Sequence, residues 1–193
     1  MKKLRRSEIL DLVEYEKARD QFLAKTIELK KLRRVGVGNL LTFIFENRDT
    51  VRFQVQEMLR AERAVDEDAI AHEIQVYNQL IPGKAELSAT LMIEITESEQ
   101  IRPTLDRLAG IDEFVFLDLG EIQVRASFDP RQFEEDRISA VQYLRFRLGD
   151  EGCAAFLAPA HRVQLRVSHP EYDAEIELEG DVRASLAADL RDD

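Results

Sequence analysis

Apolar residues recur at helical spacing in the first half of the chain and alternate with polar residues in the second half. From Ser7 to about Arg34 the spacing predicts a long helix that Ser7 caps. Gly36 and Gly38 follow as stop signals, so we expect a simple turn from this helix into the next element. The short run 40–46 then predicts a strand, because it is apolar and rich in strand-forming residues.

Two further segments with helical spacing lie at residues 51–62 and 66–81. The first carries apolar residues and Glu62 on one face, and the second has an apolar face that ends before Pro82 and Gly83. The turn at residues 63–65 is too short to let the two helices lie apart. They are therefore expected to form an antiparallel helical hairpin.

From residue 86 onward the apolar residues have a period of two, which is typical of strands. The predicted strands are 87–95, 113–118, 121–128, 138–148, 162–168 and 173–179, and the predicted helices are 98–109, 150–158 and 181–190. We expect an α+β fold in which the N-terminal helix and the helical hairpin pack on a mostly antiparallel sheet of about six to seven strands.

The predicted elements form a single domain over residues 1–193, in which residues 1–83 are helical, residues 84–180 are rich in strands and residues 181–193 form a C-terminal helix. In the strand-rich region the order strand, helix, strand, strand occurs twice, and Ser88-Ala89 stands 51 residues before Ser139-Ala140. A duplicated strand-helix-strand-strand unit would give a pseudo-twofold sheet or open barrel with helices on one side. Two similar arrangements that arose by chance explain the same pattern.

The composition is that of a globular protein, because 45% of the 193 residues are hydrophobic and 34% are charged. No apolar run approaches the roughly 18 residues of a membrane span. The acids Glu8 and Asp11 interrupt the region in which a signal peptide would have its apolar core. A single cysteine, Cys153, forms neither an internal disulfide nor a thiolate zinc site. We therefore expect a cytoplasmic protein without a membrane contact, and no feature specifies an oligomeric state.

The net charge of −11 is distributed unevenly along the chain. Residues 1–34 carry 11 Lys or Arg and 6 acids, which leaves 16 bases and 32 acids for the other residues. Nucleic-acid binding through the basic helix is disfavoured, because the acidic remainder repels phosphates. We expect the basic end of the helix to dock on the acidic body or on an acidic partner protein; it consists of Lys30, Lys31, Arg33 and Arg34.

The cofactor and catalytic motifs that the sequence suggests are incomplete. The Gly-Val-Gly run at 36–38 follows a predicted helix instead of a strand, so it does not fit a dinucleotide-binding loop. His72 begins a His-Glu pair but lacks the second histidine of a zinc-protease helix, because position 76 is valine. The segment 169–173 gathers a histidine and two acids between two predicted strands, and it is expected to be a turn rather than a set of ligands. No cofactor is therefore predicted from these motifs.

Polar residues of the hairpin give the sequence its candidate site. If the hairpin turns between Ala64 and Val65, Glu57 lies opposite His72. Carboxylates near an apolar face need partners, because their desolvation is costly. One hypothesis is a polar pocket formed by Arg48, Asp49, Gln54, Glu57, Arg60, Glu62, His72, Glu73 and Tyr77, in which a bound metal ion would have Glu57, Glu62, His72 and Glu73 as its ligands. The alternative is a network of Arg/Glu pairs that fixes the register of the hairpin.

Five stretches of the chain resemble a bacterial family known as a domain of unknown function. They are FENRDTVRFQVQEMLRAER (45–63), YNQLIPG (77–83), ELSATLMIEI (86–95), DRISAVQYLRF (136–146) and HPEY (169–172). The resemblance covers nearly the whole chain, and the first stretch is its most specific segment. It implies gene neighbours that encode a rubrerythrin-like protein and an iron-sulfur oxidoreductase, and hence a role in redox or peroxide-stress physiology. It implies no activity and no catalytic residues.

These observations favour a cytoplasmic accessory or binding protein that works with a redox partner, either a rubrerythrin-like or an iron-sulfur protein. The alternative is a metal-dependent enzyme or metal-binding protein that uses the hairpin carboxylates and His72. One structural observation bears on both hypotheses. It is whether these carboxylates converge on a cavity or are paired with arginines.

Overall fold

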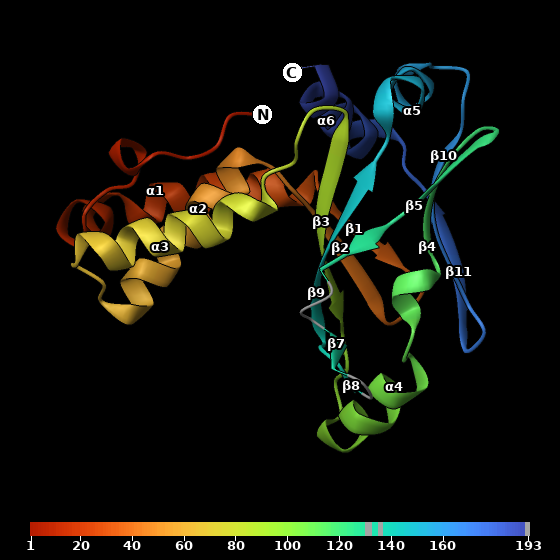
Figure 1. The fold of residues 1–193 in the computed structure, drawn as a ribbon, viewed down its shortest axis with the longest axis horizontal. Helices are drawn as coiled ribbons and strands as arrows, with labels where there is room; N and C mark the ends of the chain where they lie inside the picture. Colours follow the sequence, from red (N-terminus) through yellow and green to blue (C-terminus); the bar gives the residue numbers. More distant parts are fainter. Residues whose placement is uncertain (130–132, 135–136, 192–193) are drawn as a thin grey trace.

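A strand-rich body and a helical arm that projects from it make up the molecule (Figure 1). The computed structural model describes residues 1–129, 133–134 and 137–191. Asp192 and Asp193, which the sequence assigns to the C-terminal helix, lie outside these residues. The α+β fold class is confirmed. Among the described residues, no helix combines the length and apolar character that crossing a membrane requires.

The arm consists of α-helices joined by short connections. Its helices are α1 (Leu12–Lys31), α2 (Arg48–Glu62) and α3 (Glu67–Tyr77), with short 3-10 helices η1 (Arg6–Glu8) and η2 (Asn78–Leu80). Helices α2 and α3 form the predicted hairpin (Figure 1). Val51, Val55 and Leu59 of α2 are buried together with Ile70 and Ile74 of α3, so the apolar stripes of the two helices stabilise the arm.

The N-terminal helix is shorter than the sequence predicts. It begins at Leu12 because the side chain of Asp11 accepts a hydrogen bond from the Glu14 N–H (2.8 Å) and caps the helix there. Ser7, the predicted cap, lies in η1 instead. Ile9 is buried in the core of the arm, so the chain before α1 packs on the hairpin rather than extending the helix.

The predicted turn over residues 36–38 is wrong, because Arg34–Val37 is a strand, β1. It pairs antiparallel with β2 (Leu41–Glu46). Val35 and Val37 point into the core on either side of Gly36, so glycine here occupies an exposed strand position. The turn comes later, at Gly38, whose φ of +64° lies in the left-handed region that favours glycine.

Two larger sheets occur among the residues that the structure describes, where the pattern predicts a single sheet. The first has the order β1-β2-β3-β9-β6, and the second has the order β11-β10-β4-β5. Their further strands are β3 (Glu86–Ile93), β4 (Val115–Leu119), β5 (Ile122–Arg125), β6 (Ser127–Phe128), β9 (Val141–Arg147), β10 (Val163–His169) and β11 (Tyr172–Glu177), while β7 (Phe133–Glu134) pairs with β8 (Arg137–Ile138). Both larger sheets are antiparallel throughout.

The two sheets enclose one apolar core and meet at two corners. At one corner β5 continues through Ala126 into β6, so the chain passes from the second sheet to the first. At the other corner the hydroxyl of Tyr172 in β11 donates to the carbonyl of Val37 (2.7 Å) and accepts from the N–H of Leu40 (3.1 Å). The body is therefore an open barrel. Its strands fall into two sheets because the hydrogen-bonded pairing is interrupted at these corners.

The order strand, helix, strand, strand occurs twice in the body, as β3-α4-β4-β5 and β9-α5-β10-β11. The helices of the body are α4 (Ile101–Arg107), α5 (Gly149–Leu157) and α6 (Gly180–Arg191), with 3-10 turns η3 (Ser98–Gln100) and η4 (Ile111–Glu113). β3 pairs with β9, β4 pairs with β10, and β5 and β11 flank the second sheet, as a pseudo-twofold requires. The helices do not lie on one side as expected, because α4 is at one end of the barrel and α5 is at the other (Figure 1).

A buried arginine joins the end of the basic helix to the body. Arg33 is 1% exposed, and its guanidinium donates to the carbonyls of Phe45 (2.7 Å) and Glu46 (3.1 Å). It also forms an ion pair with Asp189 of α6. Arg34 next to it pairs with Glu94 at 2.6 Å. Two of the four basic residues at this end therefore contact acids of the body, which is one of the two expected modes of docking.

Candidate functional site

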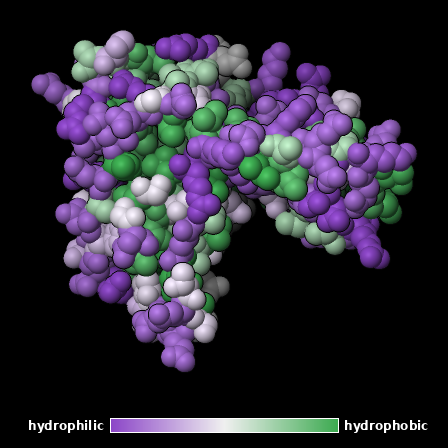
Figure 2. All heavy atoms as spheres, turned by 180° about the vertical axis from the view of Figure 1, so that it is seen from behind, coloured by the Kyte–Doolittle hydropathy of each residue, from purple (hydrophilic) through white to green (hydrophobic). Residues whose placement is uncertain are grey.

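A cleft of about 750 Å³ lies where the arm meets the first sheet. Figure 2 shows the arm standing out from the body, with apolar surface exposed in the angle between them. The arm contributes Met58, Glu62, Glu73, Val76, Tyr77, Gln79 and Leu80 to the cleft, and the sheet side contributes Glu46, Ser88, Ala89, Ser127, Phe128, Asp129, Tyr143, Leu144, Arg145 and Arg147. The cleft thus depends on both regions of the molecule.

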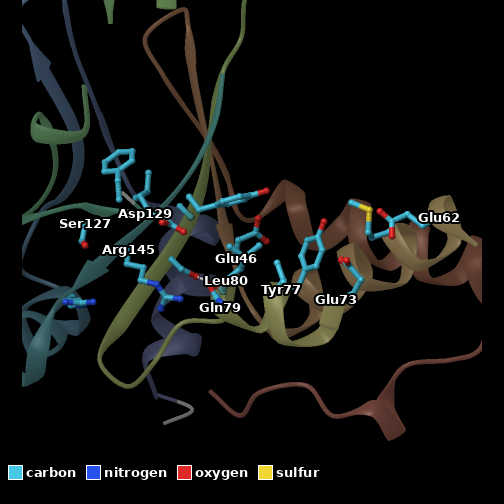
Figure 3. A pocket seen from close by; sticks show the side chains of 17 residues that line it. Glu46, Glu62, Glu73, Tyr77, Gln79, Leu80, Ser127, Asp129 and Arg145 are labelled. Carbon is cyan, nitrogen blue, oxygen red and sulfur yellow. Dashed lines mark hydrogen bonds between the residues drawn. The ribbon is translucent and has the colours of Figure 1, made fainter. Parts of the chain in front are cut away.

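Local periodicity explains which side chains reach the cleft. Met58 and Glu62 are one helical turn apart on α2, beside the buried stripe. Glu73 and Tyr77 have the same spacing on α3, and Figure 3 shows both pointing into the space next to the sheet. On β9, residues 143, 145 and 147 line the cleft and alternate with residues that are buried in the barrel. Two helices and one strand therefore present regular polar stripes to a common space.

Glu46 is the most deeply buried charge in the cleft, with 4% of its surface exposed. One carboxylate oxygen accepts a hydrogen bond from the hydroxyl of Thr90 (2.6 Å). The other accepts from the hydroxyl of Thr50 and from the amide of Gln54 (3.0 Å). All three donors are neutral. Among the described residues no cation forms a salt bridge with this carboxylate, and that is unusual because buried carboxylates are commonly paired.

Two tyrosines line the cleft near this carboxylate. Burial raises the pKa of Tyr143, and the negative charge of Glu46 raises it further. Burial likewise raises the pKa of Tyr77, with further contributions from Tyr143 and from the carboxylates of Glu73 and Glu62. Both phenols therefore stay protonated at neutral pH; burial is the main cause of the two shifts, and the neighbouring carboxylates add to them.

The other half of the cleft carries two arginines from β9. The guanidinium of Arg145 donates to Glu86 at 2.9 Å, and Arg147 lies 4.0 Å from the same carboxylate. Lys3 lies close by, since burial and the charge of Arg145 lower its pKa while Glu86 raises it. Glu86 thus balances part of the positive charge of this half, whereas no described cation forms a salt bridge with Glu46, Glu62 or Glu73.

Three of the predicted pocket residues, Glu62, Glu73 and Tyr77, line the cleft. Gln54 supports it by its hydrogen bond to Glu46 (3.0 Å). His72 is exposed and does not line the cleft, so it does not face Glu57 across a pocket as the centred hairpin suggests. Helix α2 turns its buried stripe toward α3, which directs its other polar residues elsewhere.

The remaining predicted residues belong to contacts between the arm's own segments. Glu57 accepts hydrogen bonds from Tyr15 (2.8 Å) and from Arg19 (2.8 Å) of α1, and the Arg19 guanidinium lowers the pKa of Glu57 although burial opposes this. Arg48 pairs with Glu8, Arg60 pairs with Glu16 (2.7 Å), and Asp49 is exposed at the start of α2. The arginine pairs therefore hold α2 against the N-terminal segment and α1, and they leave Glu62 and Glu73 at the cleft.

The four predicted metal ligands do not come together among the residues that the structure describes. No group of three or more His, Cys, Asp or Glu side chains there is placed to hold a metal ion. Glu62 and Glu73 share the cleft, whereas Glu57 faces α1 and His72 faces solvent.

Sequence reasoning missed the sheet side of the cleft. Tyr143, Arg145 and Arg147 stand on the polar side of a correctly predicted strand, which the alternating pattern identifies as pointing away from the core. Glu46 is a charged residue at the end of an apolar run, and a charge in such a position indicates a buried group that needs polar partners. Their partners could not be named, because the place of the arm against the sheet depends on tertiary packing.

Fold and cleft together define a class of α+β protein, in which an open barrel carries a helical arm and the junction between them is hollow. Residues 3–190 match the family model "Protein of unknown function (DUF3501)", and the chain belongs to this family. A similar crystal structure is that of a novel protein of unknown function from Burkholderia pseudomallei K96243. It is 39% identical, the match covers 98% of this chain and 100% of that chain, and the TM-score is 0.91. No curated protein matches. The resemblance to a bacterial family of unknown function is confirmed, and its gene neighbours stay a prediction.

Proposed function

We propose that this protein is an accessory or binding protein that holds a small molecule in the cleft between arm and body. The observation that carries the proposal is the construction of the cleft from both regions, with charged and aromatic side chains facing a space of about 750 Å³. This volume is in the range of cavities that enclose small ligands. A ligand that touches both regions would also stabilise the position of the arm, because it would bridge elements joined by few other contacts.

The proposal includes a cytoplasmic location and a redox partner. The location is supported by the single cysteine, which indicates a chain that does not depend on disulfides. The rubrerythrin-like or iron-sulfur partner is supported by the family resemblance. An accessory protein that delivers or senses a small molecule for such a partner would not need catalytic residues of its own.

Retention of small molecules tests the proposal. The purified protein is incubated with a small-molecule extract, passed through a desalting column, denatured and analysed by mass spectrometry. In Ser127→Trp, an indole from β6 would fill the cleft, and in Val65→Trp the same side chain lies at the exposed hairpin turn, where Val65 is 77% exposed. We expect the wild type and Val65→Trp to retain the same compound and Ser127→Trp to lose it.

Equal retention by all three proteins, or none by any of them, would overturn the proposal. Both variants must first show the circular dichroism spectrum and cooperative melting of the wild type. Elemental analysis of the same samples tests the metal-binding alternative, because a stoichiometric transition metal in the wild type would favour that alternative over an organic ligand.

A further inference from the structure

The cleft has an excess of negative charge where the end of β2 meets α2 and α3. Glu46 is buried and accepts hydrogen bonds from neutral donors alone. A buried carboxylate that keeps its charge gains free energy from a nearby cation, because the low-dielectric surroundings strengthen the attraction. The protein supplies no such cation within salt-bridge distance among the residues that the structure describes.

Two further carboxylates face the same space from the arm. Glu62 of α2 and Glu73 of α3 form neither a salt bridge nor a hydrogen bond to another described side chain. The three arginines of α2 are engaged elsewhere, since Arg48 pairs with Glu8, Arg60 pairs with Glu16 and Arg52 lies over the ring of Phe22. Burial is the main cause of the raised pKa of Tyr77, and Tyr143, Glu73 and Glu62 raise it further, so both carboxylates act on this phenol.

Aromatic and apolar side chains lie between these carboxylates. Tyr77 and Tyr143 line the cleft with protonated rings, and Met58 and Leu80 add apolar surface beside them. Aromatic faces attract ammonium groups, and apolar side chains accommodate the alkyl carbons that carry such a group. A bare metal ion would instead need several oxygen ligands around one point, and the described residues contain no such cluster.

The arginine side of the cleft does not favour an anion strongly enough to reverse this preference. Arg145 and Arg147 both face Glu86, which is 10% exposed at its side chain and balances part of their charge. An anionic ligand would bring another negative charge close to Glu46 and Glu73. A neutral ligand would leave the buried carboxylate without a counter-ion.

We propose that the cleft binds a small organic cation that carries a primary ammonium group on an alkyl chain. The carboxylates of Glu46, Glu62 and Glu73 give the cleft a negative potential that attracts the cation, and the rings of Tyr77 and Tyr143 contact the ammonium group together with the adjacent methylene groups. Glu46 and Glu62 lie on opposite sides of Tyr77 (Figure 3), so the three carboxylates do not meet at one point. This inference rests on the proposed function of the cleft as a binding site, and it names the chemical class of the ligand.

Titration calorimetry with three probes of equal length tests the charge preference. The probes are the diamine cadaverine, the neutral pentanediol and the dianion glutarate. We expect cadaverine to bind with one molecule per chain and to raise the melting temperature, and we expect the other two to do neither. Saturable binding of glutarate but not of cadaverine would overturn the proposed class of ligand. The absence of binding by all three probes would overturn it as well.

Two double variants separate the cleft from general attraction to an acidic protein. Glu62→Gln with Glu73→Gln removes two charges at the cleft, and Glu97→Gln with Glu99→Gln removes two exposed charges outside it. We expect the first pair to weaken cadaverine binding by about tenfold or more and the second pair to change it by less than about twofold. An equal loss in both would show nonspecific ionic attraction and would contradict the proposal.

Substitution of Tyr77 tests the role of its ring. Tyr77→Phe keeps an aromatic face and should bind cadaverine within about twofold of the wild type, whereas Tyr77→Ala should weaken binding by about fivefold or more. An equal effect of the two substitutions would show that the ring of Tyr77 does not contribute to cadaverine binding. If cadaverine fails but the wild type retains an extract compound that Ser127→Trp loses, the ligand class is wrong and the binding function stands. If nothing is retained either, both are wrong.

Discussion

Body and arm differ in what holds them together. In the described residues the body has a continuous apolar cluster of 28 buried side chains, whereas the cluster of the arm has 8. Ion pairs occur in both regions, for example Arg166–Asp118 in the body, but the arm with its smaller apolar cluster depends on them more. The pairs between its segments are Arg6–Glu67, Arg48–Glu8, Arg19–Glu57 and Arg60–Glu16. Apolar burial is insensitive to salt and pH, and exposed ion pairs are sensitive to both. The arm should therefore open at a lower free energy than the barrel, which suits an element that closes on a ligand.

Truncation of one core side chain in each region should show the largest difference between body and arm, both in the free energy of unfolding and in which elements lose protection against hydrogen exchange. Phe146 is fully buried in the barrel, and Phe146→Ala should lower the free energy of unfolding by about 3–5 kcal/mol. Leu59→Ala in the arm should lower it by about 2–4 kcal/mol at most. Urea unfolding measures both values. Hydrogen exchange should show lost protection across both sheets in Phe146→Ala and mainly in α1, α2 and α3 for Leu59→Ala. Equal loss of protection in β10 for the two variants would mean that arm and body unfold as one unit.

Removal of the buried arginine between arm and body should have the next largest effect. Arg33→Met removes the guanidinium that donates to two backbone carbonyls and pairs with Asp189, so we expect a loss of about 3 kcal/mol in the free energy of unfolding. Lys31→Met in the last turn of α1, two residues before Arg33, is the control. Its ammonium group is 63% exposed and pairs with Glu28, so the change should stay within about 0.5 kcal/mol.

A similar loss in the Lys31 and Arg33 variants would mean that net charge, rather than this buried contact, governs docking of the basic helix. From the sequence alone, the four basic residues at this end, Lys30, Lys31, Arg33 and Arg34, cannot be distinguished. The structure distinguishes them by burial, since Arg33 is 1% exposed while Arg34 is more than half exposed.

Most elements could be predicted because their signals are local. The alternation in β4, β9 and β10 reflects one buried and one more exposed face of each strand, and the hairpin follows from two apolar stripes and a short turn. The division into two sheets could not be predicted. It depends on Tyr172 contacting β1 and on the chain crossing at Ala126, and these contacts join residues far apart in the sequence.

The candidate site could be predicted only partly for the same reason. Glu62, Glu73 and Tyr77 follow from the helical periodicity of polar residues in an amphipathic hairpin. The partner of Glu57 does not follow from this periodicity. It is Arg19 of α1, and no local pattern specifies how α1 packs against α2. Glu46 belongs to a predicted strand, and its exposure to the cleft depends on where the arm leaves the sheet.

The corner at which the β1–β2 turn meets β11 should respond to a single methyl group. At Gly38 a Cβ would lie 2.2 Å from the hydroxyl oxygen of Tyr172, and the φ of +64° is unfavourable for alanine. Gly38→Ala should therefore cost about 1–3 kcal/mol in unfolding free energy. Gly36→Ala is the matched control, because a Cβ there meets nothing within 4 Å. If the two substitutions have equal effects, the contact of Tyr172 with the β1 turn does not stabilise the barrel.

Lowering the pH should destabilise the arm before the body. This is the smallest of the four effects expected here. The pKa of Glu57 is lowered by its hydrogen bond to Arg19, although burial opposes the shift, and the pKa values of Glu8 and Glu67 are lowered by Arg48 and Arg6. A lowered folded-state pKa means that the stabilisation is present above the ordinary value of 4.5 and is lost as the pH falls through the lowered value.

Protection of the arm against hydrogen exchange, corrected for the intrinsic rate, should therefore be constant from neutral pH to about pH 5 and should decrease below pH 4.5, before that of the barrel. Glu57→Gln should remove some of this pH dependence and lower the protection of the arm at neutral pH, since its amide cannot form the ion pair with Arg19. Glu97→Gln, an exposed acid outside the arm, should leave the profile unchanged. If the barrel loses protection first, or if the Glu57→Gln profile runs parallel to that of the wild type, these ion pairs do not hold the arm, and its stability has to come from the eight buried side chains of its core.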